Sequence, residues 1–218
     1  MNKQALIAVA LLIILSTITT SQKIEISNLK VKQINVENNY LIKTIEIKNL
    51  LMPLYGKNII LLSNNEITTL LNQNSLIDSF KVKKKYPDII KIMIFEKKPI
   101  AILLKEKTKF FISEKGDLIK FENFKKYQNL PYVIGNQNEF KIIYDNLKKI
   151  KFPLKDVQKY ILYNSNRWDI EFENNKIIKL PIENYTKSLK NFLELKDRNN
   201  FQKYKIFDYR VKNQLILK

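Results

Sequence analysis

An unbroken apolar run opens the chain and is followed by a short segment rich in serine and threonine. Residues 5–15 carry only apolar side chains, and residues 16–21 contain no clear small-x-small alanine cleavage site. A membrane span needs about 20 apolar residues, whereas about 10 to 14 are typical of a signal-peptide core. We therefore expect an N-terminal membrane anchor or a signal sequence over residues 1–22. Either one places residues 24–218 outside the cytoplasm.

The next part of the chain alternates between the period of a strand and the period of a helix. Apolar residues alternate over residues 29–36, which predicts a strand, and residues 40–51 are expected to form a helix. Ser63 and Glu66 have the spacing of a capping box and predict the start of a second helix. Two further runs of period two flank a turn at Pro87, so we expect the order β-α-α-β-β over about 70 residues.

Pro99 introduces a second region with many short strand-like pieces. Residues 130–135 are expected to form a loop, and helices are expected at residues 138–150 and 183–195. Strands are expected at 100–104, 110–112, 118–120, 157–163, 168–172, 177–180, 205–209 and 215–217. The predicted fold class is α+β: an N-terminal hydrophobic helix over 1–22, a small domain over 24–98 and a mixed β-rich domain with flanking helices over 99–218.

The formal charge of +18 raises the question of a nucleic acid or an anionic surface as partner. The basic residues are almost all lysine, and the only arginines are Arg167, Arg198 and Arg210. Nucleic-acid readers favour arginine because its planar guanidinium binds phosphates and guanine edges through two bonds. We therefore expect no nucleic-acid partner. A secreted or anchored basic envelope protein that binds an anionic surface or nucleic acid remains the alternative.

The composition also argues against an enzyme. There is no histidine and no cysteine, which excludes thiol nucleophiles, imidazole bases and nearly all zinc sites. Asp78, Glu96 and Glu171 are acidic, but their spacing brings no two of them together, and no glycine-rich phosphate loop is present. We expect no catalytic residue, cofactor, metal or small-molecule substrate.

The apolar segment Gln214–Lys218 predicts a terminal strand at the edge of a sheet. An edge strand has unpaired backbone N–H and C=O groups, which a strand of a second protein can pair with. The other interpretation is an ordinary edge that Lys212 and Lys218 protect from such pairing. The sequence leaves both interpretations open.

The chain resembles the FtsQ/DivIB family of bacterial cell-division proteins. The segment Ile77–Ala101 is similar to the family's POTRA hairpin, with an aromatic-Pro turn, a strand that ends in Glu96 and then Pro-x-Ala. Further similar motifs follow in the family's order at Gly116-Asp117, Leu130-Pro131 with Gly135, Arg167-Trp168 and Phe207-Asp208-Tyr209-Arg210. Two glycines that are usual in the family are replaced, by Glu37 after the first strand and around Asn213-Gln214 in the last hairpin.

The resemblance implies a POTRA domain over 24–98 and a single-pass inner-membrane protein whose bulk is periplasmic and enriched at the division septum. It implies docking of FtsB- and FtsL-like bitopic division proteins, with a strand of the FtsB-like partner added to the last strand of this chain. Arg210 is expected to pair with a carboxylate of that partner. The implied partner-binding residues are Arg210, Val211, Asn213, Gln214, Leu215, Ile216 and Leu217.

Overall fold

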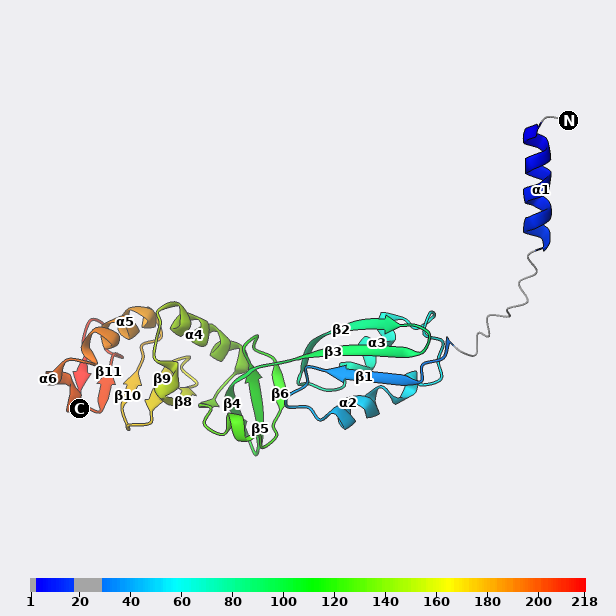
Figure 1. Ribbon diagram of the computed structural model, residues 1–218. Coiled ribbons are helices and arrows are strands. Elements are labelled where there is room, and N and C mark those ends of the chain that lie inside the picture. The colour runs from blue at the N-terminus through cyan, green and yellow to red at the C-terminus, as the bar shows by residue number, and fades with distance from the viewer. Residues whose placement is uncertain (1–2, 18–28) are drawn as a thin grey trace. The chain divides into compact units, whose positions relative to one another are not determined.

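The computed structural model describes residues 3–17 and 29–218 (Figure 1). The apolar run forms α1 (Lys3–Thr17), and its described leucine, isoleucine and valine side chains are exposed. The predicted anchor continues to residue 22, and its part beyond residue 17 lies outside the described residues. None of the helices formed by the described residues combines the length and the apolar character that crossing a bilayer requires.

Contacts divide the chain into two compact units that interleave along the sequence. The smaller unit consists of Met1–Glu37, Thr44–Leu71 and Lys81–Met93, and the larger unit consists of Asn38–Lys43, Asn72–Phe80 and Ile94–Lys218. The long strands β2 (Ile77–Lys85) and β3 (Ile89–Glu96) each contribute residues to both units. A domain boundary at residue 99 stays a prediction.

A three-stranded sheet in the order β1-β3-β2 pairs β1 (Gln33–Glu37) in parallel with β3. Between β1 and β2 the chain forms α2 (Thr44–Leu50), the 3-10 turn η2 (Met52–Leu54) and α3 (Asn64–Leu71). The expected β-α-α-β-β order is therefore confirmed. The residues that bury apolar side chains in this part are Ile34, Ile47, Leu51, Ile67, Leu71, Ile90 and Ile92.

One of the two bonds of the capping box is present, because the Glu66 N–H donates to Ser63 Oγ at 3.2 Å, while the Glu66 carboxylate pairs with Lys57. Helix α2, in contrast, begins at Thr44, later than the expected residue 40. The reason is the carboxylate of Glu96, whose Oε1 accepts the N–H groups of residues 40–42 at 2.9 Å each. A charged acceptor that holds three successive amides competes with helical geometry there.

The larger unit contains a nine-stranded sheet in the order β12-β11-β10-β9-β8-β7-β4-β5-β6. Three neighbouring pairs are parallel, namely β4 with β7, β7 with β8, and β10 with β11, and the other pairs are antiparallel. The strands are β4 (Pro99–Lys105), β5 (Thr108–Ser113), β6 (Leu118–Lys120), β7 (Tyr132–Ile134), β8 (Val157–Leu162), β9 (Trp168–Phe172), β10 (Ile177–Lys179), β11 (Ile206–Asp208) and β12 (Ile216–Leu217).

One face of this sheet packs against α4 (Gln137–Lys149) and α5 (Tyr185–Leu195), which Figure 1 shows on the same side of the strands. Both helices bury apolar residues three or four positions apart, as an amphipathic helix does. The core between helices and sheet includes Val133, Phe140, Ile143, Tyr160, Trp168, Ile170, Ile178, Leu189, Phe192 and Phe207. Trp168 is 6% exposed, so it is a core residue.

The expectation of a loop over residues 130–135 is wrong. Residues Tyr132–Ile134 form β7, which lies between β4 and β8 in the interior of the sheet. A strand of three residues is too short to show an alternation, and Pro131 and Gly135 on either side are typical of loops. The sequence also gave no sign of the short helix α6 (Asn199–Gln202) or of the 3-10 turns η3 (Lys125–Tyr127) and η4 (Leu154–Asp156).

Candidate partner-binding edge

Strand β12 is the outermost strand at one end of the nine-stranded sheet. It pairs only with β11 on its inner side, in antiparallel register, with Phe207 opposite Leu217 and Asp208 opposite Ile216. We call residues 214–217 the C-terminal edge. Among the described residues no strand pairs with its outer side.

The hydrogen bonds show which backbone groups of the C-terminal edge point outward. Ile206 and Lys218 exchange both backbone bonds, at 3.0 and 3.2 Å. In an antiparallel pair such residues alternate with pairs whose N–H and C=O groups point away from the partner strand. Leu217 is the next residue, so its backbone groups point away from β11. The two-residue period of extended chain gives Leu215 the same direction.

The side chains of the C-terminal edge alternate in the same way. Leu215 and Leu217 pack against the core of the larger unit, whereas Ile216 is 38% exposed. The two leucines therefore fix the edge to the sheet with their side chains while their backbone groups face outward. Leu215 and Leu217, both predicted as partner-binding residues, therefore share this orientation.

Arg210 already has a carboxylate partner within this chain. Asp208 Oδ1 accepts the Arg210 Nε–H at 2.8 Å and the Arg210 backbone N–H at 3.1 Å, and Asp208 Oδ2 accepts from Nη2. The guanidinium therefore lowers the pKa of the Asp208 carboxyl, and the hydrogen bond that Arg210 donates to Asp208 raises the pKa of Arg210. The expected carboxylate of a partner thus has to share a guanidinium that Asp208 holds in a fixed orientation.

The turn between β11 and β12 borders a hollow of about 850 Å³ whose other wall is α5. Asn213 occupies the left-handed backbone region that asparagine tolerates, with φ of 60°, and the Gln214 N–H donates to the Val211 carbonyl at 3.1 Å. The residues that line the hollow are Pro181, Glu183, Asn184, Lys187, Ser188, Asn191, Tyr209, Arg210, Val211, Lys212, Asn213, Gln214 and Leu215. Five of the seven predicted partner-binding residues therefore line one hollow, and Ile216 and Leu217 continue from it along the open edge.

Sequence reasoning missed a charged row on the other face of the sheet. Asp169 on β9, Lys179 on β10 and Asp208 on β11 lie side by side in register. Asp169 is 3% exposed, burial raises the pKa of its carboxyl, and its Oδ1 lies 3.7 Å from Arg167 Nε without a hydrogen bond. Asp208 and Arg210 are two residues apart, a spacing that puts both on one face of a strand, and this signal was readable in the sequence.

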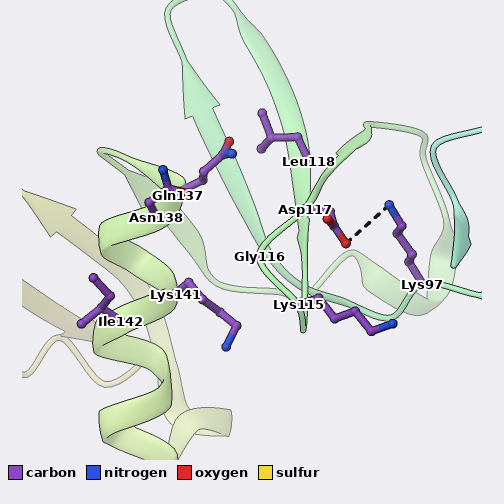
Figure 2. A pocket seen from close by; sticks show the side chains of 9 residues that line it. All are labelled: Lys97, Lys115, Gly116, Asp117, Leu118, Gln137, Asn138, Lys141 and Ile142. Carbon is purple, nitrogen blue, oxygen red and sulfur yellow. Dashed lines mark ion pairs between the residues drawn. The ribbon is translucent and has the colours of Figure 1, made fainter.

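A second hollow, of about 630 Å³, lies between the β5–β6 turn and the first turns of α4 (Figure 2). Its charged groups are engaged in ion pairs, within the hollow or just outside it. Lys97 Nζ lies 3.4 Å from the Asp117 carboxylate, as the dashed line in Figure 2 marks, and Lys141 pairs with Asp145 one helical turn away. Asp117 is the only carboxylate that lines it, so the hollow has no pair of acids for proton transfer.

The three acidic residues singled out in the sequence are not combined either. Glu96 holds backbone amides, Glu171 pairs with Lys159 at 2.7 Å, and Asp78 pairs with a lysine at 2.7 Å. Within residues 3–17 and 29–218 no group of three or more metal-ligating side chains is close enough to hold a metal ion. These side chains have structural partners.

Comparisons with known proteins agree on one family. The family model "POTRA domain, FtsQ-type" matches residues 29–97, and the model "Cell division protein FtsQ/DivIB, C-terminal" matches residues 101–210, half of the chain. The second match ends at Arg210, so the C-terminal edge lies beyond it.

Two individual relatives are similar over about half of this chain. The cell division protein FtsQ of Methylomonas methanica is 24% identical over 110 residues, which are 50% of this chain and 43% of that protein. The major extracytoplasmic domain of DivIB from Geobacillus stearothermophilus, in its trans isomer, is 18% identical, with a TM-score of 0.35 over 48% of this chain and 98% of that chain. With both halves of the sequence after residue 28 matched to models of one family, the chain belongs to the FtsQ/DivIB family of cell division proteins.

Proposed function

We propose that this protein is a divisome scaffold of the inner membrane that recruits FtsB- and FtsL-like bitopic proteins to the septum through its C-terminal edge. A role in cell division follows from the family. The partners, the membrane location and the mode of docking are the proposed part. The observation that carries the proposal is the outermost position of β12, which leaves the backbone groups of Leu217 and Leu215 facing outward.

Docking by strand addition uses two kinds of contact at this edge. Backbone bonds from the outward groups set the register of the incoming strand, and side chains then select the partner. Arg210, Lys187 and Lys212 around the adjacent hollow outnumber its one acid, Glu183. The edge therefore suits a partner strand flanked by acidic side chains, because opposite charges favour encounter and orientation.

The location rests on the N-terminal segment. The segment 1–22 is proposed to remain as an uncleaved anchor, with residues 24–218 in the periplasm. Long domains cross the membrane largely regardless of their charge, so the net charge of +18 does not oppose this orientation.

Replacement of outward-facing residues by proline tests the docking mode. Leu215→Pro and Leu217→Pro each remove one outward N–H donor and place a ring in the path of the incoming strand. We expect each variant to bind the FtsB-like protein encoded by the same genome about tenfold more weakly or worse, measured by fluorescence energy transfer between the two full-length proteins reconstituted in the same vesicles.

The matched control is Leu215→Ala, which keeps the N–H donor and removes a side chain that packs on the core. We expect it to lower the unfolding temperature but to retain most of the binding. Equal affinity of the folded proline variants and the natural protein would refute the strand-addition proposal.

A further inference from the structure

Three segments of the smaller unit meet at Leu29, the first described residue after α1. The Ile59 N–H donates to the Leu29 carbonyl at 2.8 Å, and Lys30 forms a bridge with Asn58. The turn between β2 and β3 lies there too, because Lys32 N–H donates to the Asp88 carbonyl at 2.9 Å. We call segments 29–32, 57–62 and 84–88 together the entry end.

The entry end exposes large apolar side chains. Leu61 is 80% exposed, Tyr86 61% and Ile60 54%. The loop that carries Ile60 and Leu61 is held in place, since Lys84 Nζ donates to the Leu62 carbonyl at 2.7 Å and to the Ile60 carbonyl at 3.3 Å. Neighbouring exposed apolar side chains on a fixed loop mark a surface that contacts something other than water.

The entry end also carries basic side chains. The entry end contains Lys30, Lys32, Lys57, Lys84 and Lys85. Two carboxylates balance part of this charge: Asp88 lies 3.6 Å from Lys32, and Glu66 pairs with Lys57. Exposed apolar side chains together with basic ones are typical of proteins that bind an anionic lipid surface.

The covalent chain keeps this end near α1. Residues 18–28 join Thr17 to Leu29. A fully extended chain spans at most about 3.6 Å per residue, so these eleven residues reach no further than about 40 Å. If α1 is held in the bilayer, the entry end is the part of the smaller unit with the shortest tether to the lipid surface.

We propose that the entry end docks on anionic phospholipid, with Leu61, Ile60 and Tyr86 in the headgroup layer and Lys30 and Lys85 on the lipid phosphates. This inference rests on the anchoring part of the proposed function and goes beyond it, since anchoring alone requires no contact between the folded part and the lipid. Docking of the entry end fixes the orientation of the smaller unit relative to the membrane.

The test adds one tryptophan at a time to the full chain, in vesicles of brominated phospholipid that quench tryptophan on contact. The natural chain has a single tryptophan, Trp168, whose side chain is buried, so its signal is a constant background. Leu61→Trp reports on the entry end and Leu12→Trp on the anchor. Ile45→Trp is the matched control, because Ile45 is 61% exposed at the start of α2 and β1 carries the chain away from the entry end before α2 begins.

We expect roughly twofold quenching of the added tryptophan in Leu61→Trp with vesicles that contain phosphatidylglycerol, and little quenching in Ile45→Trp. The Leu61→Trp signal should recover with phosphatidylcholine alone and in the additional variant Lys30→Glu/Lys85→Glu. Both losses follow from removing the charge attraction.

The outcomes distinguish a failure of the lipid docking from a failure of the membrane anchor. Quenching in Leu12→Trp without quenching in Leu61→Trp overturns the docking and leaves the anchor intact. In that case the exposed apolar side chains of the entry end would be assigned to a protein partner. No quenching at either position overturns both. Equal quenching in Leu61→Trp and Ile45→Trp indicates general adhesion of a basic protein and also overturns the docking.

Discussion

Asp208 fixes the orientation of the Arg210 side chain. The carboxylate accepts both the side-chain Nε–H and the backbone N–H of Arg210, so the turn and the guanidinium are fixed by the same group. A guanidinium has five N–H donors, and those that Asp208 does not engage remain for a partner. The resemblance implied Arg210 as a binding residue but did not imply its pairing with Asp208, which depends on the turn that follows β11.

The Asp208 pair predicts a dependence of stability on pH. The arginine lowers the pKa of Asp208 in the folded protein, so the pair stabilises the fold above the ordinary aspartate pKa of about 3.9 and loses this effect as the pH falls through the lowered value. Asp208→Asn should therefore cost about 1 to 3 kcal/mol at pH 7, and the difference from the natural protein should vanish in acid well below the pKa of Asp208.

Thermal unfolding of both proteins at neutral and acidic pH measures this effect. Asp197→Asn is the control, because the side chain of Asp197 is 81% exposed and its ion pair with Lys196 is a surface pair of little weight. A constant difference between Asp208→Asn and the natural protein across this pH range would contradict the ion-pair explanation.

At the scale of elements, long periodic segments were predictable from the sequence and short ones were not. The cap of α3 at Ser63 and the helices α4 and α5 follow from local signals. Strand β7 has three residues and its pairing with β4 and β8 is entirely between distant segments, so no local signal exists for it. The edge position of β12 was expected, whereas the hollow beside it depends on α5 and could not be inferred without the fold.

Gly135, which follows β7, predicts a steric effect. Its φ is +148°, and an added Cβ would lie 2.6 Å from the Leu162 Cβ, closer than atoms can approach without a shift. Gly135→Ala should therefore displace β8 from β7 and destabilise the larger unit by about 1 to 3 kcal/mol in urea-induced unfolding.

Gly116→Ala provides the matched control in the same unit. Gly116 also has positive φ, at +93°, but its added Cβ would meet only the flexible side chain of Lys141, with the Cγ atom at 3.3 Å. This variant should lose about 1 kcal/mol from backbone strain alone. A smaller loss in Gly135→Ala than in Gly116→Ala would show that β8 adapts to the added methyl group.

At the scale of the whole molecule, the charge of +18 leaves a binder of anionic polymers as the alternative, and salt dependence separates it from the scaffold. Many of the lysines pair with carboxylates of the same chain, for example Lys91 with Glu37 at 2.7 Å and Lys148 with Glu114 at 2.6 Å. Partner binding through backbone bonds and apolar contacts should weaken only slightly between about 0.1 and 0.5 M salt, whereas binding that releases counterions falls steeply. A steep loss of affinity for the FtsB-like protein would contradict docking through backbone bonds and apolar contacts.

The shortness of β12 sets a limit on what its edge can hold alone. Two outward-facing residues offer about four backbone hydrogen bonds, and each contributes about 0.5 to 1.5 kcal/mol net. That sum corresponds to an affinity between tens of millimolar and, at best, tens of micromolar, before the cost of ordering the incoming strand. A scaffold and a partner that are both tethered to one bilayer meet at a high effective concentration, and this confinement makes a brief strand sufficient. The edge is thus suited to a partner that is already nearby, and the same partner free in solution should largely fail to stay bound.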